Sequence, residues 1–235
     1  MRGKVKNFIL DLLYPKFCFN CGREGSYLCS DCQSTLEILS SHTRATAKGG
    51  DEVAASSTTE YRTQELKDLY FALPYRNPLI KNLTKLFKYE PFVKELAQPL
   101  TSLIITHFQL IEKSPADLAD CILMPVPLEK RKLKWRGFNQ AEEIGRELAQ
   151  FFQIPLLNNV LAKIKETPPQ VELSDEERKE NIKGAFFCQS SEKIKGKKIL
   201  LVDDIYTTGS TMEECAKVLK TAGAKEIIGI VVARG

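Results

Sequence analysis

The chain has 235 residues, of which 43% are hydrophobic and 27% charged, and its formal net charge is +4. These are ordinary values for a globular protein, and this length suits one α/β domain plus a small appendage. No apolar run approaches the roughly 18 residues that span a bilayer, so a transmembrane segment is excluded and a cytoplasmic protein is expected. Neither common glycine-rich nucleotide motif, G-x-x-x-x-G-K-[ST] or G-x-G-x-x-G, occurs.

The N-terminal residues predict a short amphipathic helix over 4–14, because apolar side chains recur there at helical spacing. Packing on the segment that follows is one use for this helix, and peripheral contact with a membrane surface is the other. Asp11 interrupts the apolar stretch before it reaches signal-peptide length, and no A-x-A cleavage site follows. The helix is therefore expected to stay with the protein.

Four cysteines follow as two C-x-x-C pairs, Cys18 with Cys21 and Cys29 with Cys32. Four thiolates at this spacing predict one tetrahedral Zn²⁺, whose role is structural because no position is left for a catalytic water. Two disulfides are the alternative, and they would require an oxidising compartment. We therefore expect residues 1–39 to form a helix and a small zinc-binding module with four cysteine ligands.

Residues 40–60 contain few large apolar side chains, and this composition predicts a flexible linker. Residues 61–235 then form the α/β domain, which opens with a strand and helices. In the segment K-N-L-T-K-L-F-K-Y, Leu83, Leu86 and Phe87 fall on one helical face. Further helices are expected over residues 96–111 and 141–152.

Residues 122–140 begin as a short apolar strand that Pro125 and Pro127 end. A cation-rich loop is predicted next, with Lys130, Arg131, Lys132, Lys134 and Arg136. Such a loop suits a pyrophosphate, although a run of charges also occurs as a merely solvated face. Lysines between residues 193 and 198 form a second cluster, and the same positive potential attracts a DNA backbone.

Residues 198–211, K-I-L-L-V-D-D-I-Y-T-T-G-S-T, predict a buried parallel strand, an acidic pair and a small-residue turn that opens a helix. Ligands of open α/β sheets lie at the carboxyl ends of the strands, where Asp203 and Asp204 stand. Small and hydroxylated residues let backbone N–H groups approach a phosphate. The acids then accept hydrogen bonds from sugar hydroxyls, directly or through Mg²⁺; the alternative is that they only cap a turn. We predict a site for a phosphorylated ribose.

Residues 199–211 resemble the phosphoribosyl pyrophosphate (PRPP) signature of type I phosphoribosyltransferases. The pattern M-P-V-P followed by R-G-F-N-Q-A is similar to the ComF family, a competence-associated branch of the same fold. The resemblance implies a type I phosphoribosyltransferase-like parallel sheet flanked by helices. It also implies that Asp203 and Asp204 hold the ribose hydroxyls. The 5′-phosphate would lie on Thr207, Thr208, Gly209, Ser210 and Thr211.

The resemblance also assigns a pyrophosphate loop, in which the candidate residues are Val126, Pro127, Lys130, Arg131 and Arg136. In this fold the segment before the PRPP strand is a mobile loop that closes over the site. Residues 163–181 fall there, and the candidates are Lys163, Lys165, Gln170, Arg178 and Asn181. A solvated connection is the alternative for this segment.

Two functions follow from the resemblance. The first is a non-catalytic module that binds PRPP with Mg²⁺ and handles single-stranded DNA during natural transformation, beside a helicase-like competence ATPase. The second is an active phosphoribosyltransferase that releases pyrophosphate on transfer to a nitrogenous acceptor. The acceptor is not encoded in any motif of the chain, so both functions remain open at this point.

Overall fold

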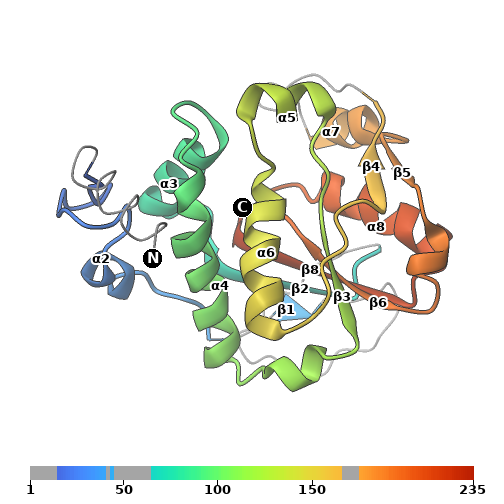
Figure 1. Cartoon of the computed structure of the whole chain (residues 1–235), viewed down its shortest axis with the longest axis horizontal. Coiled ribbons are helices and arrows are strands. Elements are labelled where there is room, and N and C mark those ends of the chain that lie inside the picture. Colours follow the sequence, from blue (N-terminus) through green and yellow to red (C-terminus); the bar gives the residue numbers. More distant parts are fainter. Residues whose placement is uncertain (1–14, 41–42, 45–64, 166–174) are drawn as a thin grey trace, which may run out of the picture.

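The computed structural model describes residues 15–40, 43–44, 65–165 and 175–235. Their centre is a six-stranded sheet (Figure 1). In spatial order its strands are β1 (Thr43–Arg44), β2 (Asp68–Pro74), β8 (Glu226–Arg234), β6 (Lys198–Val202) and β3 (Cys121–Pro125), and the short β7 (Ile205–Tyr206) also pairs with β8. Every pair is parallel except β1 with β2. The predicted parallel sheet is confirmed.

Strand β1 comes from the segment that was predicted to be a linker. Thr43 and Arg44 pair antiparallel with Leu69 and Asp68 at the edge of the sheet. Residues 41–42 and 45–60 lie outside the described residues. Two residues of the predicted linker are thus part of the sheet, and the division at 40–60 remains a prediction.

Helices cover both faces of the sheet. Along β6, Leu200 and Val202 point into one core with helices α3 (Pro78–Lys88), α4 (Ala97–Leu110) and α6 (Gln140–Phe152). Ile199 and Leu201 point into the other core with α8 (Ser210–Thr221). The unbroken apolar run of β6 therefore reflects burial on two faces. In Figure 1, α4 and α6 lie side by side in front of the sheet.

The three helices predicted over 81–89, 96–111 and 141–152 are confirmed as α3, α4 and α6. Leu83 and Phe87 of α3 are fully buried, as their spacing predicts. Asn77 caps α3 by accepting hydrogen bonds from the backbone N–H groups of Leu79 and Ile80. Asn139 caps α6 in the same way at Ala141.

The predicted cation-rich loop is wrong, because residues Lys130–Arg136 form helix α5. Lys, Arg and Leu are good helix formers, and Gly137 ends the helix with φ +82° in the left-handed region. The backbone N–H of Gly137 donates to the carbonyl of Leu133. The charges are consequently distributed around a helix.

A two-stranded antiparallel sheet of β4 (Leu161–Lys163) and β5 (Phe186–Cys188) stands apart from the main sheet. Helix α7 (Asp175–Ile182) lies between them in sequence and packs on α8. Residues 166–174 lie outside the described residues. Short 3₁₀ helices occupy Lys94–Leu96, Pro115–Leu118 and Ser191–Lys193.

The cysteine segment packs against the main domain, beside α3 and α4 in Figure 1. Helix α2 (Ser30–Ser34) carries Gln33, whose Nε2 donates to Ser102 Oγ at 3.2 Å. The backbone N–H of Leu39 donates to the carbonyl of Ala72 in β2. The predicted helix over 4–14 lies outside the described residues. Within the part of the chain that is described, none of the helices combines the length and apolarity that a bilayer crossing needs.

Candidate functional site

A cavity of about 640 Å³ opens at the carboxyl ends of β3 and β6. Its wall is built from α3, the segment that joins β3 to α6, the segment 203–212, and Lys163 and Phe186 of the small sheet. All seven residues predicted to hold PRPP line it: Asp203, Asp204, Thr207, Thr208, Gly209, Ser210 and Thr211. The acids and the turn therefore face one space, as an extended ligand requires.

The chain does not turn directly after Val202. It continues beside β8 with an unchanged register, since Val202 aligns with Ile230 and Ile205 with Ala233. The backbone N–H of Asp203 donates to Ile230, and the carbonyl of Asp204 accepts from Val232. The acidic pair is thereby fixed between two strand segments.

Asp204 is the buried member of the pair, with 2% of its side chain exposed. Its Oδ1 lies 2.8 Å from Lys88 Nζ and accepts the backbone N–H of Ile205 at 2.8 Å. Its Oδ2 is buried and has no hydrogen-bond partner among the described residues. A buried carboxylate oxygen without a partner is costly, so this atom is available to a ligand.

Asp203 lies beside it, and its Oδ1 accepts the backbone N–H of Asp204 at 2.9 Å. Burial and the neighbouring charge of Asp204 raise the pKa of Asp203 to about 8, against the opposing effect of Lys88. Burial alone would lower the pKa of Lys88, but the charges of Asp204 and Asp203 outweigh it and raise this pKa. The lysine is the internal counter-ion of the acidic pair.

The turn is shaped by Gly209, which has φ +76° and lies directly before α8. A Cβ at this position would lie 2.1 Å from Tyr206 Oη, so only glycine fits. Tyr206 in turn donates to Glu213 Oε1 at 3.2 Å. Thr208 Oγ1 and Ser210 Oγ are 2.8 Å apart and share a hydrogen bond. Backbone N–H groups at this helix start are suited to an anion.

Arg136 is one of the two α5 cations that line the cavity, the other being Lys132. Arg136 donates to Gln140 Oε1, and Gln140 Nε2 donates to the carbonyl of Phe87 at 2.7 Å. Its Nε is buried without an acceptor in the described part of the chain, and burial lowers its pKa. The guanidinium is therefore held in place with donor capacity unused.

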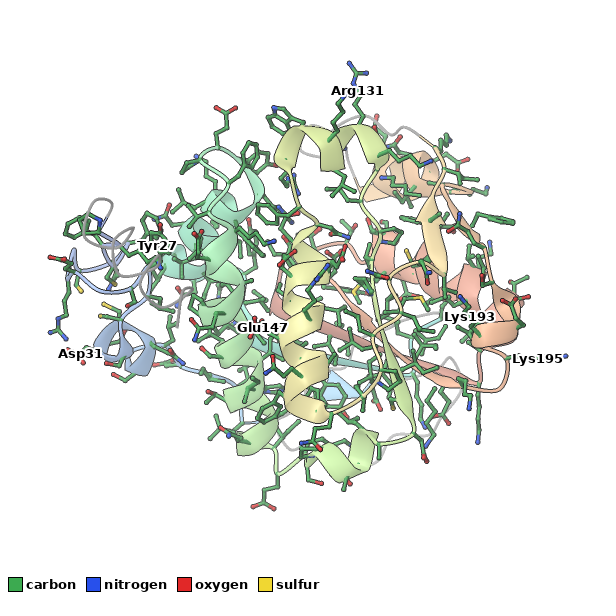
Figure 2. All side chains as sticks on the ribbon, in the orientation of Figure 1. Tyr27, Asp31, Arg131, Glu147, Lys193 and Lys195 are labelled. Atoms are coloured by element: carbon green, nitrogen blue, oxygen red, sulfur yellow. The ribbon has the colours of Figure 1, made fainter. Side chains whose placement is uncertain are left out.

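The other predicted pyrophosphate-loop residues divide into two groups. Val126 and Pro127 line the cavity, and the carbonyl of Val126 is held by Asn139 Nδ2 at 3.0 Å. Lys130 and Arg131 are not among the lining residues. Figure 2 shows Arg131 projecting from α5 away from the molecule.

Of the predicted mobile-loop residues, Lys163 ends β4 and lines the cavity. Burial, and to a smaller degree the charge of Lys132, lowers its pKa. Lys165 is exposed and Asn181 lies in α7, and neither lines the cavity. Gln170 and the side chain of Arg178 lie outside the described residues.

The lysines of residues 193–198 do not belong to this site. Lys198 begins β6, and Asp203 follows its end, so the cluster lies at the opposite edge of the sheet. Five strand residues separate the two ends by about 16 Å. In Figure 2, Lys193 and Lys195 lie on the side of the molecule away from α5.

Several cavity residues were not predicted as site residues: Lys85, Lys88, Tyr89, Trp135 and Gln140. A signal for Lys88 and Tyr89 was present, because the segment L-F-K-Y also weakly resembles the ComF family. The long-range contact of Lys88 with Asp204 has no local signature in the sequence.

The four N-terminal cysteines converge, with all four Sγ atoms within 4.8 Å of one another. The Sγ atoms of Cys21 and Cys29 are 3.6 Å apart, too far for a disulfide and close to the roughly 3.8 Å that a tetrahedral Zn²⁺ with 2.3 Å bonds implies. Asn20 Nδ2 donates to Cys32 Sγ at 3.3 Å, and the N–H of Cys29 donates to Cys18 Sγ at 3.5 Å. The residues fit a metal ion.

Comparison with known proteins agrees with this geometry. Residues 136–235 match the model of the phosphoribosyl transferase domain. Competence protein F of Haemophilus influenzae is 39% identical over 106 residues, 45% of this chain and 46% of that protein. Competence protein ComFC of Streptococcus pneumoniae is 38% identical over 104 residues, 43% of each. The chain is therefore similar to the ComF proteins over about half of its length.

A further relative is the DNA utilization protein YhgH of Salmonella typhimurium, which is 30% identical over 133 residues. This match covers 57% of the present chain and 58% of YhgH. The chain thus spans about half the length of the curated relatives it matches. The matched domain includes the acidic pair and the turn, since both lie within residues 136–235.

Proposed function

We propose that this chain binds PRPP in the cavity and handles single-stranded DNA in the uptake of DNA during natural transformation. The observation that carries the proposal is the convergence of the acidic pair and the turn 207–211 on one cavity. The turn offers N–H groups and hydroxyls to the 5′-phosphate, and the acids accept the ribose hydroxyls.

Mg²⁺ fits the acidic pair, because it prefers oxygen ligands and Asp204 Oδ2 is a buried carboxylate oxygen without a partner in the described residues. Asp203 and Asp204 would hold it, and a bound Mg²⁺ offsets the charge of the pyrophosphate. The pyrophosphate would also contact positively charged side chains of the cavity lining, namely Arg136, Lys132 and Lys163.

Zn²⁺ is the metal proposed for Cys18, Cys21, Cys29 and Cys32, with a structural role. Leu28 and Leu36 of this segment share one core with α4. A metal bound there fixes the segment to the α/β domain and stabilises the fold.

The DNA-handling role draws on the names of the competence and DNA utilization relatives. Lys130, Arg131 and Lys134 are exposed on α5, outside the cavity lining, where a DNA backbone can reach them. We further propose that the chain works in the cytoplasm beside a helicase-like competence ATPase. Peripheral membrane contact through residues 4–14 belongs to the same proposal.

An active phosphoribosyltransferase is the second candidate, favoured by the enclosed cations at the cavity wall. In that reaction the bond from ribose C1 to pyrophosphate breaks, and a bond from C1 to the acceptor nitrogen forms. Arg136, Lys132 and Lys163 would hold the departing pyrophosphate, while the acids stabilise positive charge that develops on the sugar. Release of pyrophosphate from PRPP on addition of a panel of bases distinguishes this enzyme from a binding module.

The test of PRPP binding is thermal unfolding in the presence of PRPP and Mg²⁺. At a hundredfold excess over the dissociation constant, PRPP should stabilise the fold by about 2.7 kcal/mol. Asp204→Asn should weaken this effect. Asp120→Asn is the matched control, because Asp120 is exposed and precedes β3 at the opposite edge of the sheet. An unchanged melting temperature at millimolar PRPP would contradict the proposal.

The test of DNA handling is binding of a labelled single-stranded oligonucleotide at several salt concentrations. Because cations release counterions from phosphates, the affinity should fall steeply as salt rises. Lys130→Ala with Lys134→Ala should weaken binding more than Lys193→Ala with Lys195→Ala. Binding that is absent or independent of salt would contradict the role.

A further inference from the structure

Two exposed aromatic side chains line the rim of the cavity. Trp135 is 58% exposed and Tyr89 is 43% exposed. The other exposed large aromatics of the described residues, Phe17, Phe151 and Phe187, do not line it. Aromatic side chains usually bury their large apolar surface, so two exposed rings at a cavity rim are suited to contact a ligand.

The indole of Trp135 is held in position by Phe92. Their ring centroids lie 4.8 Å apart and the ring planes meet at 86°, an edge-to-face contact. Such a contact covers at most one face of the indole, because one of the two rings meets the other with its edge. At least one face of Trp135 is therefore not covered by Phe92.

Phe92 is itself fixed by the backbone. Its φ of +54° lies in the left-handed region, which is uncommon for an aromatic residue. Its N–H donates to the carbonyl of Tyr89, and the N–H of the buried Val93 donates to Leu86. A strained conformation persists only where the surroundings hold it, so the support behind Trp135 is rigid.

Cations accompany these rings. Lys85 and Lys132 also line the cavity, and Arg136 follows Trp135 in the same helix. Aromatic faces with nearby positive charge are the combination that binds nucleobases joined to phosphates, because the base stacks on the ring while a cation meets the phosphate.

We propose that Trp135, with Tyr89, forms a stacking subsite for a nucleobase at the mouth of the cavity. Two sources can supply this base: a free nucleotide, or a base of single-stranded DNA. The proposal rests on the proposed function for the pentose site, and it adds a second contact next to that site.

Trp135 is the single tryptophan of the chain, so its fluorescence reports directly on this subsite. The unmodified protein is titrated with adenosine monophosphate, with a (dT)12 oligonucleotide, and with an abasic oligonucleotide of the same length. Quenching by the monophosphate assigns the base of a free nucleotide, and quenching by (dT)12 but not by its abasic counterpart assigns a DNA base. Absence of quenching by both base-containing ligands overturns the proposal, as does equal quenching by the abasic strand.

Variants give an independent measurement through the anisotropy of labelled ligands. Trp135→Ala should weaken binding of the quenching ligand about 5-fold or more, since stacking on an aromatic side chain contributes about that factor per base or more. Trp135→Phe should retain most of the affinity. Phe187→Ala is the control, because Phe187 is 56% exposed but does not line the cavity. Equal affinity of Trp135→Ala and the parent overturns the proposal.

Failure of this inference is separable from failure of the pentose site. Stabilisation by PRPP with unaltered tryptophan fluorescence in the base titrations removes only the stacking subsite. Base-dependent quenching without stabilisation by PRPP removes the proposed function and leaves the stacking contact in place.

Discussion

The ion pair between Lys88 and Asp204 should contribute strongly to the stability of the protein, and Lys88→Met tests this contribution. Removing the ammonium leaves a carboxylate that is 2% exposed beside a second acid, Asp203. A matched control is Lys85→Met, because Lys85 is an exposed lysine of the same helix that also lines the cavity.

The magnitude follows from the distance of 2.8 Å between Lys88 Nζ and Asp204 Oδ1. At an effective dielectric constant of about 20, the attraction is about 6 kcal/mol before desolvation is subtracted. Removing one partner of a buried pair typically costs about 3–5 kcal/mol. Because 30% of the Lys88 side chain is exposed, we expect a loss of about 3 kcal/mol in the free energy of unfolding.

The assay is urea denaturation of the parent, Lys88→Met, Asp204→Asn and the double variant. The two single changes should not add, and the coupling free energy should reach about 2 kcal/mol. Lys85→Met should change the stability by less than about 0.5 kcal/mol. The reasoning is refuted if the two changes add to within about 0.5 kcal/mol, or if both lysine variants lose the same amount.

Three further predictions concern the acidic pair, the turn and the cysteines. Because the pKa of Asp203 is about 8 in the folded protein instead of 3.8, the folded chain keeps a proton that the unfolded chain releases, and the free energy of unfolding should decline from about pH 4 to pH 8. Asp203→Asn should flatten this decline, and identical pH profiles of the variant and the parent would contradict the prediction. Gly209→Ala should destabilise the fold more than Gly184→Ala, which shares a positive φ but meets no atom within 4 Å; equal losses would refute the close approach to Tyr206. Atomic absorption should find one zinc per chain in the parent and in the Cys188→Ser variant, but none in the Cys32→Ser variant. A zinc-free protein with full stability would refute the structural role.

Local sequence patterns predicted the segment that runs from strand β6 through the turn to helix α8. The apolar run before Asp203, the small residues of the turn and Gly223 after α8 each act over a few positions of the chain. Gly223 has φ +98°, and the N–H of Ala224 donates back to the carbonyl of Leu219, so a glycine ends α8 in the usual way. Sequence reasoning succeeds here because neighbouring residues determine the structure.

Helix α5 was missed although its signals are local. The density of positive charge suggested a loop, but Lys and Arg favour helices and Gly137 marks the end. The outcome changes the site, because a helix directs Arg136 and Lys132 into the cavity and leaves Lys130 and Arg131 outside its lining. Charge composition alone cannot separate these two groups.

Contacts between distant segments could not be predicted. Lys88 ends α3 and Asp204 follows β6, and only the parallel sheet brings these two elements to one edge. The same holds for Trp135 and Phe92, which meet from α5 and the turn after α3. Both pairs depend on tertiary packing, which leaves no periodic or spacing signal in the sequence.

The central claim is that the acids and the turn hold a phosphorylated pentose in one cavity, and a crystal structure with PRPP and Mg²⁺ tests it most directly. The 5′-phosphate should lie within hydrogen-bond distance of backbone N–H groups of residues 207–211, with the ribose hydroxyls at Asp203 and Asp204. Crystals grown at saturating PRPP that show this cavity without the ligand, or the ligand bound elsewhere, would contradict the account.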